Sequence, residues 1–229
     1  MKKSIFFFSL IAVSLLVMNF SISKQPKYSV NQLIGKTPMA LYGKTYKLQK
    51  EAYTALSKMI KDASRKGVKL KVVSSYRNFS HQNKIWKRKY NKFISQGFSP
   101  KKAVNKIKEY TAIPGTSRHH WGTDVDINNG QNSLTNSNKK VFITWMDENA
   151  HKYGFYRAYT NNKFRAGYSY ESWHYSYRNL SKPMLSQYNQ LDLEKILENE
   201  KIAGNNYFTS SFIKKYKADQ VYGINDYLY

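Results

Sequence analysis

Two stretches of the sequence decide the fold and the chemistry: SRHHWGTDVD at residues 117–126 and, 45 residues further on, ESWH at residues 171–174. A catalytic zinc ion takes three protein ligands from His, Asp and Glu and leaves a fourth position for water, whose pKa falls to roughly 7. His119, Asp126 and His174 meet that requirement. Each of them alone would be read as a packing or surface residue, but the joint pattern predicts a metallohydrolase site.

Glu171 is the candidate general base of this site. A carboxylate that does not bind the ion must take the proton of the water and pass it to the leaving amine. The surrounding sequence predicts a hairpin whose arms are residues 155–159 and 168–177, both rich in aromatic side chains. In a regular strand Glu171 and His174 would point to opposite faces. Both can therefore reach one ion only if the chain turns or bulges between them.

Polar and apolar side chains alternate from Asp124 to Asn128, which predicts a half-buried strand. Val125 and Ile127 would face the core, and Asp126 would face the cleft. Asp124 would lie on the same face as Asp126, so we predict that it hydrogen-bonds a ligating histidine.

These motifs resemble those of the zinc D-Ala-D-Ala carboxypeptidases of the VanY type, which are LAS-type metallopeptidases. The family signature reads Ser-x-His-x-x-Gly-x-Ala-x-Asp, followed downstream by Glu-x-Trp-His. The matching residues here are Ser117, His119, Gly122, Asp126, Glu171, Trp173 and His174. Asp124 stands where the family has a small residue, two places before the last aspartate of the motif. Because this departure changes neither a ligand nor the base, it puts the fine substrate preference in question and not the catalytic chemistry. The resemblance implies one Zn²⁺ ion, held by the two histidines and the aspartate, with the glutamate as base.

A third motif, Ser74-Ser75-Tyr76-Arg77, is similar to the family's Ser-x-Tyr-Arg at the end of the first core strand. The resemblance implies that Arg77 binds either the terminal carboxylate of the peptide or the developing oxyanion. A guanidinium suits both tasks, because it stays charged and its planar fork matches a carboxylate. The alternative is a surface arginine that caps a strand. Ser117 is a candidate to donate a hydrogen bond to substrate, or to fix the turn before His119.

The resemblance, which spans roughly residues 70–177, implies an α+β fold: a small antiparallel sheet that bears the zinc cleft, flanked by helices. The order of helical and strand patterns along the chain agrees with it. The helical pattern after Pro183 predicts a helical C-terminal extension. We expect a signal peptide at residues 1–23, an extended N-terminal lead at 24–46, a catalytic domain at 47–185 and a C-terminal extension at 186–229 packed on the same domain. The expected elements are helices at 48–65, 80–96, 99–110, 141–153 and 211–221 and a strand at 68–74, besides those named above.

The resemblance implies hydrolysis of a peptide bond in peptidoglycan stem peptides, with D-Ala-D-Ala carboxypeptidase as the leading reading. Within the same chemistry the alternatives are an L,D-carboxypeptidase, a D,D-dipeptidase and a peptidoglycan endopeptidase. A rival of another class is a cell-wall-binding module that keeps the metal site without activity. The glutamate argues against this rival, because a purely structural zinc site needs no base.

The first residues carry two lysines, an apolar run over residues 5–18 and the small residues Ser21 and Ser23, which is the layout of a secretory signal. Cleavage after Ser23 would leave no membrane span, whereas an uncleaved segment would act as an anchor. The chain has no cysteine. A lipoprotein anchor and disulfides are therefore excluded, and we expect a periplasmic or cell-wall-associated enzyme.

The net charge of +24 indicates an anionic setting such as cell-wall polymers or a phospholipid surface. Nucleic acid is the competing partner. The lysines are spread over several predicted helices and do not form one continuous basic segment, which favours a solvated basic face over a nucleic-acid-binding segment. We therefore expect an anionic wall surface and stem peptides as partners, and no nucleic acid.

Overall fold

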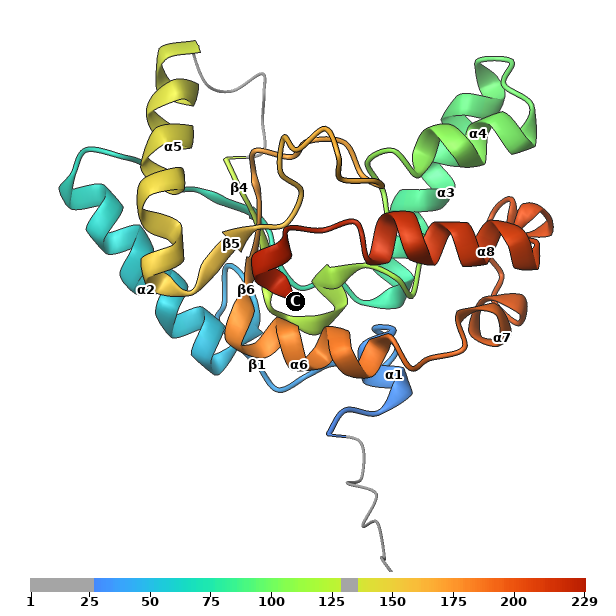
Figure 1. Cartoon of the computed structure of the whole chain (residues 1–229), viewed down its shortest axis with the longest axis horizontal. Coiled ribbons are helices and arrows are strands. Elements are labelled where there is room, and N and C mark those ends of the chain that lie inside the picture. Colours follow the sequence, from blue (N-terminus) through green and yellow to red (C-terminus); the bar gives the residue numbers. More distant parts are fainter. Residues whose placement is uncertain (1–26, 129–135) are drawn as a thin grey trace, which may run out of the picture.

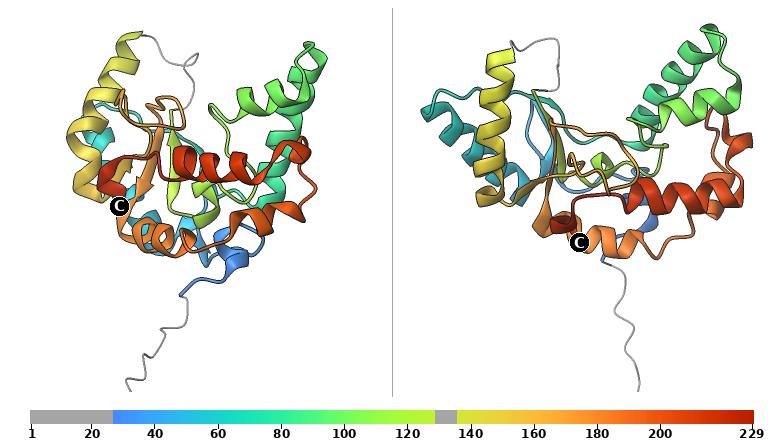
Figure 2. Two further views of the ribbon diagram at one scale, coloured as in Figure 1. Left: turned by 45° about the vertical axis from the view of Figure 1, so that its right-hand side comes forward. Right: turned by 45° about the horizontal axis from the view of Figure 1, so that its top comes forward.

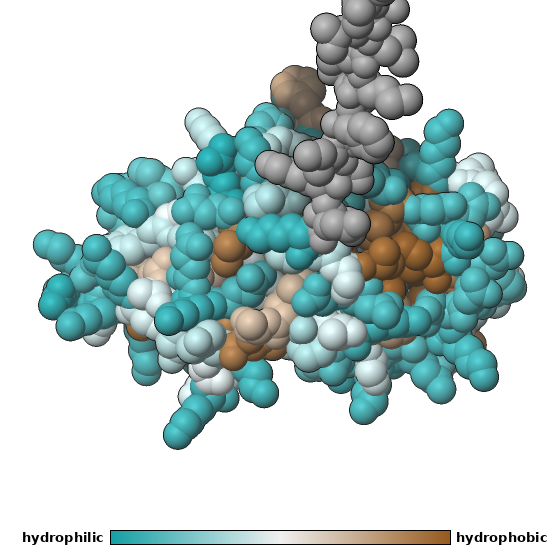
Figure 3. Space-filling view, turned by 90° about the horizontal axis from the view of Figure 1, so that it is seen from below, coloured by the Kyte–Doolittle hydropathy of each residue, from teal (hydrophilic) through white to brown (hydrophobic). Residues whose placement is uncertain are grey.

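A computed structural model of the chain describes residues 27–128 and 136–229 (Figure 1). The expected signal peptide lies outside the described residues. So does most of residues 129–137, a stretch rich in Asn, Ser and Gly whose sequence predicts a surface loop. Within these ranges, no helix is both long enough and apolar enough to span a bilayer. Hydrophilic side chains cover most of the face shown in Figure 3, with a few hydrophobic areas between them.

The centre of the molecule is a four-stranded antiparallel sheet. Its order is β3 (Val72–Ser74), β4 (Asp124–Ile127), β6 (His174–Tyr177) and β5 (Phe155–Arg157). The inner pair, β4 and β6, is buried along its whole length. This small antiparallel sheet with helices around it confirms the α+β fold that the sequence predicts.

One face of the sheet is covered by α2 (Lys50–Arg65) and α5 (Asn136–Asn149), which lie together on one side of the sheet in Figures 1 and 2. The apolar residues of α2 recur at helical spacing and form one buried face. Val125 and Ile127 of β4 are fully buried against this helix layer. Because side chains alternate along a strand, Asp126 points to the opposite face.

The opposite face of the sheet looks toward a second group of helices. These are α1 (Val30–Leu33), α3 (Phe79–Ser95), α4 (Pro100–Ile107), α6 (Arg178–Tyr188), α7 (Leu193–Glu198) and α8 (Ser210–Tyr216). Helices α3 and α4 pack against each other and form an arm that projects from the body (Figure 2). The C-terminal extension is fastened to this arm, since the indole Nε1 of Trp86 donates a 2.8 Å hydrogen bond to the Ala203 carbonyl.

Short elements complete the fold. Strands β1 (Leu41–Tyr42) and β2 (Leu48–Gln49) pair antiparallel. The N-terminal lead expected to be extended, residues 24–46, therefore contains a short helix, α1, as well as strand β1. The 3-10 turns are Arg118–Trp121, Ala150–Tyr153, Asn205–Tyr207 and Asp226–Leu228, and Lys217–Val221 is a π-helical turn after α8.

Several expected boundaries were wrong. The strand expected at 68–74 begins at Val72, and the helix expected at 141–153 begins at Asn136 and ends at Asn149. The strand expected at 168–177 begins only at His174. The helix expected at 80–96 begins at Phe79, because Asn78 caps it: the Asn78 side chain accepts a 2.8 Å hydrogen bond from the His81 amide. The helix expected over 211–221 is α-helical only to Tyr216 and then widens into the π-helical turn.

Candidate metal centre

Three separate elements bring the candidate ligands together. Asp126 and His174 lie directly opposite each other in the β4–β6 register. His119 comes from the 3-10 turn that precedes β4, and Gly122 ends this turn with a left-handed φ of 64°. This left-handed backbone conformation favours glycine, because side chains with a Cβ atom rarely adopt it. One ligand atom from each of the three residues lies within 4.8 Å of the others.

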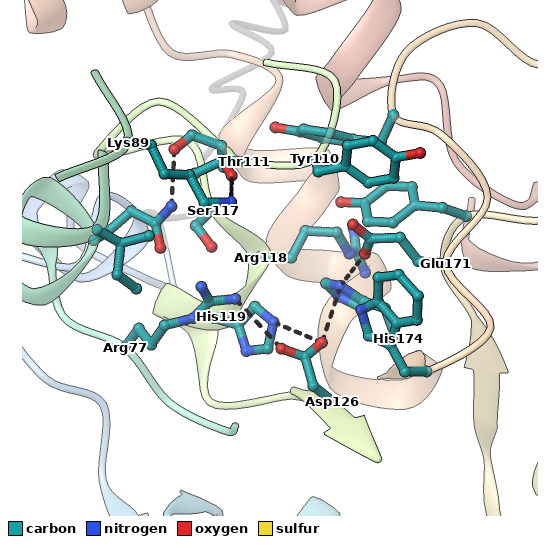
Figure 4. Close-up of a pocket in the computed structure, with 16 residues that line it drawn as sticks. Arg77, Lys89, Tyr110, Thr111, Ser117, Arg118, His119, Asp126, Glu171 and His174 are labelled. Atoms are coloured by element: carbon teal, nitrogen blue, oxygen red, sulfur yellow. Dashed lines mark hydrogen bonds and ion pairs between the residues drawn. The ribbon is translucent and has the colours of Figure 1, made fainter. Parts of the chain in front are cut away.

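The ring nitrogens and the carboxylate face a common point (Figure 4). His119 Nε2 is 3.4 Å from Asp126 Oδ1, and His174 Nδ1 is 3.6 Å from the same oxygen. His119 Nδ1 is 2.7 Å from the carbonyl oxygen of Ser75, which fixes the ring so that Nε2 points inward.

The donor set fits a divalent cation. His119 Nε2 and Asp126 Oδ1 are buried and have no hydrogen-bond partner among the described residues. Buried polar atoms are almost always paired, so two orphaned atoms that face each other indicate a missing partner. Burial raises the pKa of Asp126, but His119, His174 and Arg77 bring it down to about 2, which keeps this group a carboxylate. Two imidazoles and one carboxylate are the donors of a catalytic zinc site with an open position.

Glu171 lies beside the three candidate ligands. The chain turns at Ser172 and Trp173 before β6 begins, so both Glu171 and His174 reach the centre. Glu171 Oε2 is 3.2 Å from His174 Nδ1, and the side chain is almost fully buried. This burial raises the pKa of the Glu171 carboxyl above its ordinary value.

Asp124 contacts the candidate ligand His174, as the strand pattern predicts. Its Oδ2 is 2.9 Å from His174 Nε2 and accepts a 3.0 Å bond from Arg118 Nε, while Ser176 Oγ donates to its Oδ1 at 2.7 Å. Burial raises the pKa of Asp124, but the Arg118 charge and the His174 hydrogen bond outweigh it and hold the pKa below its usual range. Burial lowers the pKa of His174, yet its bonds to Asp124 and Glu171 raise it to about 9. The carboxylates therefore attract positive charge to this point.

Asp124→Asn is expected to lower the free energy of unfolding of the metal-free protein by about 3 kcal/mol, because Arg118 would stay buried without its partner charge. Arg118 is 5% exposed and Asp124 is fully buried. Urea unfolding measures this. Glu109→Gln is the matched control, since Glu109 pairs with Lys106 at 2.8 Å in an exposed ion pair whose loss costs below about 1 kcal/mol. Equal losses in the two variants would mean that the buried pair contributes no more than an exposed one.

The three candidate ligands line a cavity of about 400 Å³, which Arg77 and Ser117 also line (Figure 4). Arg77 Nη2 is 3.8 Å from Asp126 Oδ2, which places the guanidinium beside the candidate ligands. Its carbonyl oxygen is 2.6 Å from His120 Nδ1, and its amide donates to the His119 carbonyl at 3.1 Å. Ser117 is buried and lines the cavity. All six candidate site residues of the sequence analysis thus lie at one place.

Comparison with known proteins gives a match that includes all of these site residues. The VanY family, described as D-alanyl-D-alanine carboxypeptidase, matches residues 45–180. The chain belongs to the VanY family. A D-alanyl-D-alanine carboxypeptidase of Enterococcus faecalis is 34% identical over 142 residues, which are 61% of this chain and 52% of that protein. The chain thus matches about half the length of this relative.

Two solved VanY structures share the fold. A zinc complex of a mutant of the vancomycin resistance D,D-pentapeptidase VanY from the VanB-type cassette has a TM-score of 0.54 at 25% identity, covering 75% of this chain and 90% of that one. VanYB in complex with D-Alanine-D-Alanine has a TM-score of 0.54 at 28% identity, covering 72% of this chain and 92% of that one.

Several cavity residues had no signal in the sequence. Lys89, Thr111 and Tyr159 line the cavity together with the VanY motif residues. The Tyr159 ring lies 4.9 Å from the His174 ring, edge to face, and so packs against a candidate ligand. Lys89 is one of several lysines in α3, and only the packing of that helix distinguishes it from the others.

Proposed function

We propose that this protein is a zinc-dependent peptidase that removes the terminal D-alanine from peptidoglycan stem peptides ending in D-Ala-D-Ala. The observation that carries the proposal is the convergence of His119, Asp126 and His174 in a cavity that also holds Glu171 and Arg77. Membership of the VanY family and the likeness to VanYB, a protein solved with D-Alanine-D-Alanine, support the substrate class.

In this proposal His119, Asp126 and His174 bind the zinc ion, and Glu171 is the general base and general acid that transfers the proton. A zinc ion in such a site lowers the pKa of water and polarises a carbonyl oxygen. Glu171 Oε2 accepts the proton of the attacking water and returns it to the nitrogen of the leaving amine. Its raised pKa suits both transfers, because a base whose pKa lies closer to the working pH also gives the proton back readily.

Digestion of defined muropeptides, followed by mass spectrometry of the products, tests the proposal. Loss of one terminal D-alanine from a pentapeptide stem is expected. Loss of the terminal residue from a tetrapeptide stem would instead indicate an L,D-carboxypeptidase, release of a dipeptide a D,D-dipeptidase, and opening of a crosslink an endopeptidase. A chelator should abolish cleavage and added zinc should restore it. Wall binding that a chelator leaves unchanged, with no cleavage of any stem, would support the non-enzymatic wall-binding module.

An anionic wall surface is the second partner that we propose. Helices α3 and α4 contain eight lysines and arginines and no acidic residue, and the side chains that face solvent are Lys84, Lys87, Arg88, Lys92, Lys101, Lys102 and Lys106. Retention on isolated cell walls should fall as salt rises. The variant K101E/K102E should be retained less than K58E/K61E, which carries the same charge change on α2. Equal retention would argue against the arm as the contact.

Export completes the proposal and rests on the N-terminal sequence alone. The mass of the protein recovered outside the cytoplasm should equal that of a chain cleaved after Ser23 or near it. A full-length mass in the membrane fraction would favour the uncleaved anchor.

A further inference from the structure

Lys89 is a lysine of α3 whose ammonium group lies inside the cavity of the candidate metal centre. Its Nζ donates a 2.5 Å hydrogen bond to the hydroxyl of Thr111, which is itself buried. An ammonium has three N–H donors, and Thr111 accepts one of them. Among the residues that the structure describes, no carboxylate lies within 4.0 Å of it. The side chain is therefore a partly buried cation without an ion-pair partner.

Burying an unpaired cation costs free energy of folding unless an anion binds to it. Burial lowers the pKa of Lys89, and the negative charge of Glu171 acts in the opposite direction from across the cavity. Figure 4 shows Lys89, Thr111 and Ser117 together on one side, with Glu171 and His174 on the other. An anion that enters between them would find a charged donor and a serine hydroxyl on the same wall.

Arg118 also lines the cavity, but it is already paired with Asp124 at 3.0 Å. Two further cations, Arg77 and Lys89, lie at different places in the cavity. Arg77 lies 3.8 Å from the candidate ligand Asp126, beside the point where a scissile carbonyl must lie. Lys89 belongs to the wall away from the ligands (Figure 4). In a carboxypeptidase substrate the terminal carboxylate follows the scissile carbonyl by one residue, or about 3.8 Å of chain. The two cations thus match the two groups of the substrate: Arg77 lies near the position of the scissile carbonyl, and Lys89 lies further along the cavity, where the terminal carboxylate would follow.

We propose that Lys89, together with Thr111 and Ser117, binds the carboxylate at the end of the substrate and leaves Arg77 to the oxygen of the scissile carbonyl. This assignment rests on the proposed peptidase function and makes Lys89 a specificity-determining residue of this chain. It also decides between the two roles that the sequence leaves open for Arg77. The ligand class of the subsite is a peptide with a free terminal carboxylate.

The test compares a D-Ala-D-Ala stem pentapeptide with the same peptide ending in a carboxamide, on the zinc-loaded full chain. K89M should raise KM for the carboxylate peptide on the order of 10- to 100-fold, with kcat changed less than about threefold and the amide peptide little affected. K89R should restore most of the lost affinity because the charge returns. K61M removes an exposed lysine on α2 and should match the wild type. R77M should lower kcat for both peptides.

Two results would overturn the assignment. One is an equal loss on both peptides in K89M, which would mean that Lys89 only holds the Thr111 loop. The other is a preference for carboxylate that disappears in R77M and persists in K89M. Calorimetry of both peptides in an E171Q background applies the same criteria without turnover. Wild-type protein that binds the carboxylate peptide through Lys89 but cleaves no stem peptide would contradict the proposed function and not the subsite.

Discussion

Glu171→Gln should lower kcat on the stem peptide by about 10³-fold while the zinc content stays that of the wild type. General acid–base catalysis by a positioned side chain contributes roughly 10²- to 10⁴-fold. Glutamine keeps the size and burial of Glu171 but cannot take a proton. The three candidate ligands do not include Glu171, whose Oε2 lies 3.2 Å from His174 Nδ1. Steady-state kinetics and elemental analysis of the same preparation measure the two quantities.

The control is Glu148→Gln, which removes an exposed carboxylate of α5 on the far side of the sheet. It should change neither kcat nor zinc content. Loss of zinc in Glu171→Gln would mean that Glu171 is a ligand and that another group serves as base. Full activity of the variant would remove Glu171 from the mechanism altogether.

The sequence predicted the part of the site that depends on short-range geometry. Alternation along β4 correctly separates Val125 and Ile127, which are buried in the core, from Asp126, which lines the cavity. The same alternation predicted that Asp124 contacts one of the candidate histidine ligands, and Asp124 Oδ2 lies 2.9 Å from His174 Nε2. Such inferences succeed because a strand has a fixed period of two.

The length of the β6 arm could not be predicted, because it depends on distant partners. Aromatic residues from Tyr168 onward are typical of a strand. In the structure the Ser169 amide instead donates to the Glu109 carbonyl, and the Glu171 amide to the Tyr159 carbonyl. The first bond connects the segment to the turn after α4, and the second joins the two arms of the predicted hairpin beyond β5. Regular pairing with β4 begins at His174. No local pattern encodes the bond to Glu109.

The position of Lys89 in the cavity could not be predicted for a similar reason. Lys89 is separated from Thr111 by 22 residues and by the whole of α4. Its position depends on how α3 and α4 pack and on the C-terminal extension, whose Ala203 carbonyl accepts the hydrogen bond of Trp86. Among several lysines of one helix, only tertiary packing decides which one points into the site.

His119→Ala should abolish both zinc binding and activity. The variant leaves two of three ligands, and Asp126 Oδ1 would lose the neighbour that lies 3.4 Å away. Changes to groups that merely orient a ligand already weaken metal binding by about 10- to 100-fold, so the loss of a ligand should exceed that range. An ion present at 1,000 times its Kd stabilises the folded wild type by about 4 kcal/mol. Zinc should therefore raise the Tm of the wild type and leave that of the variant unchanged.

Thermal unfolding with chelator and with zinc gives the comparison, and circular dichroism of the metal-free variant shows whether it folds. His81→Ala is the control, because His81 is an exposed residue of α3 and should leave the zinc-dependent rise in Tm intact. A rise that persists in His119→Ala would show that the ion is held without this residue. Because Glu171→Gln is expected to keep that rise while losing activity, the two variants together separate the ligand role from the base role.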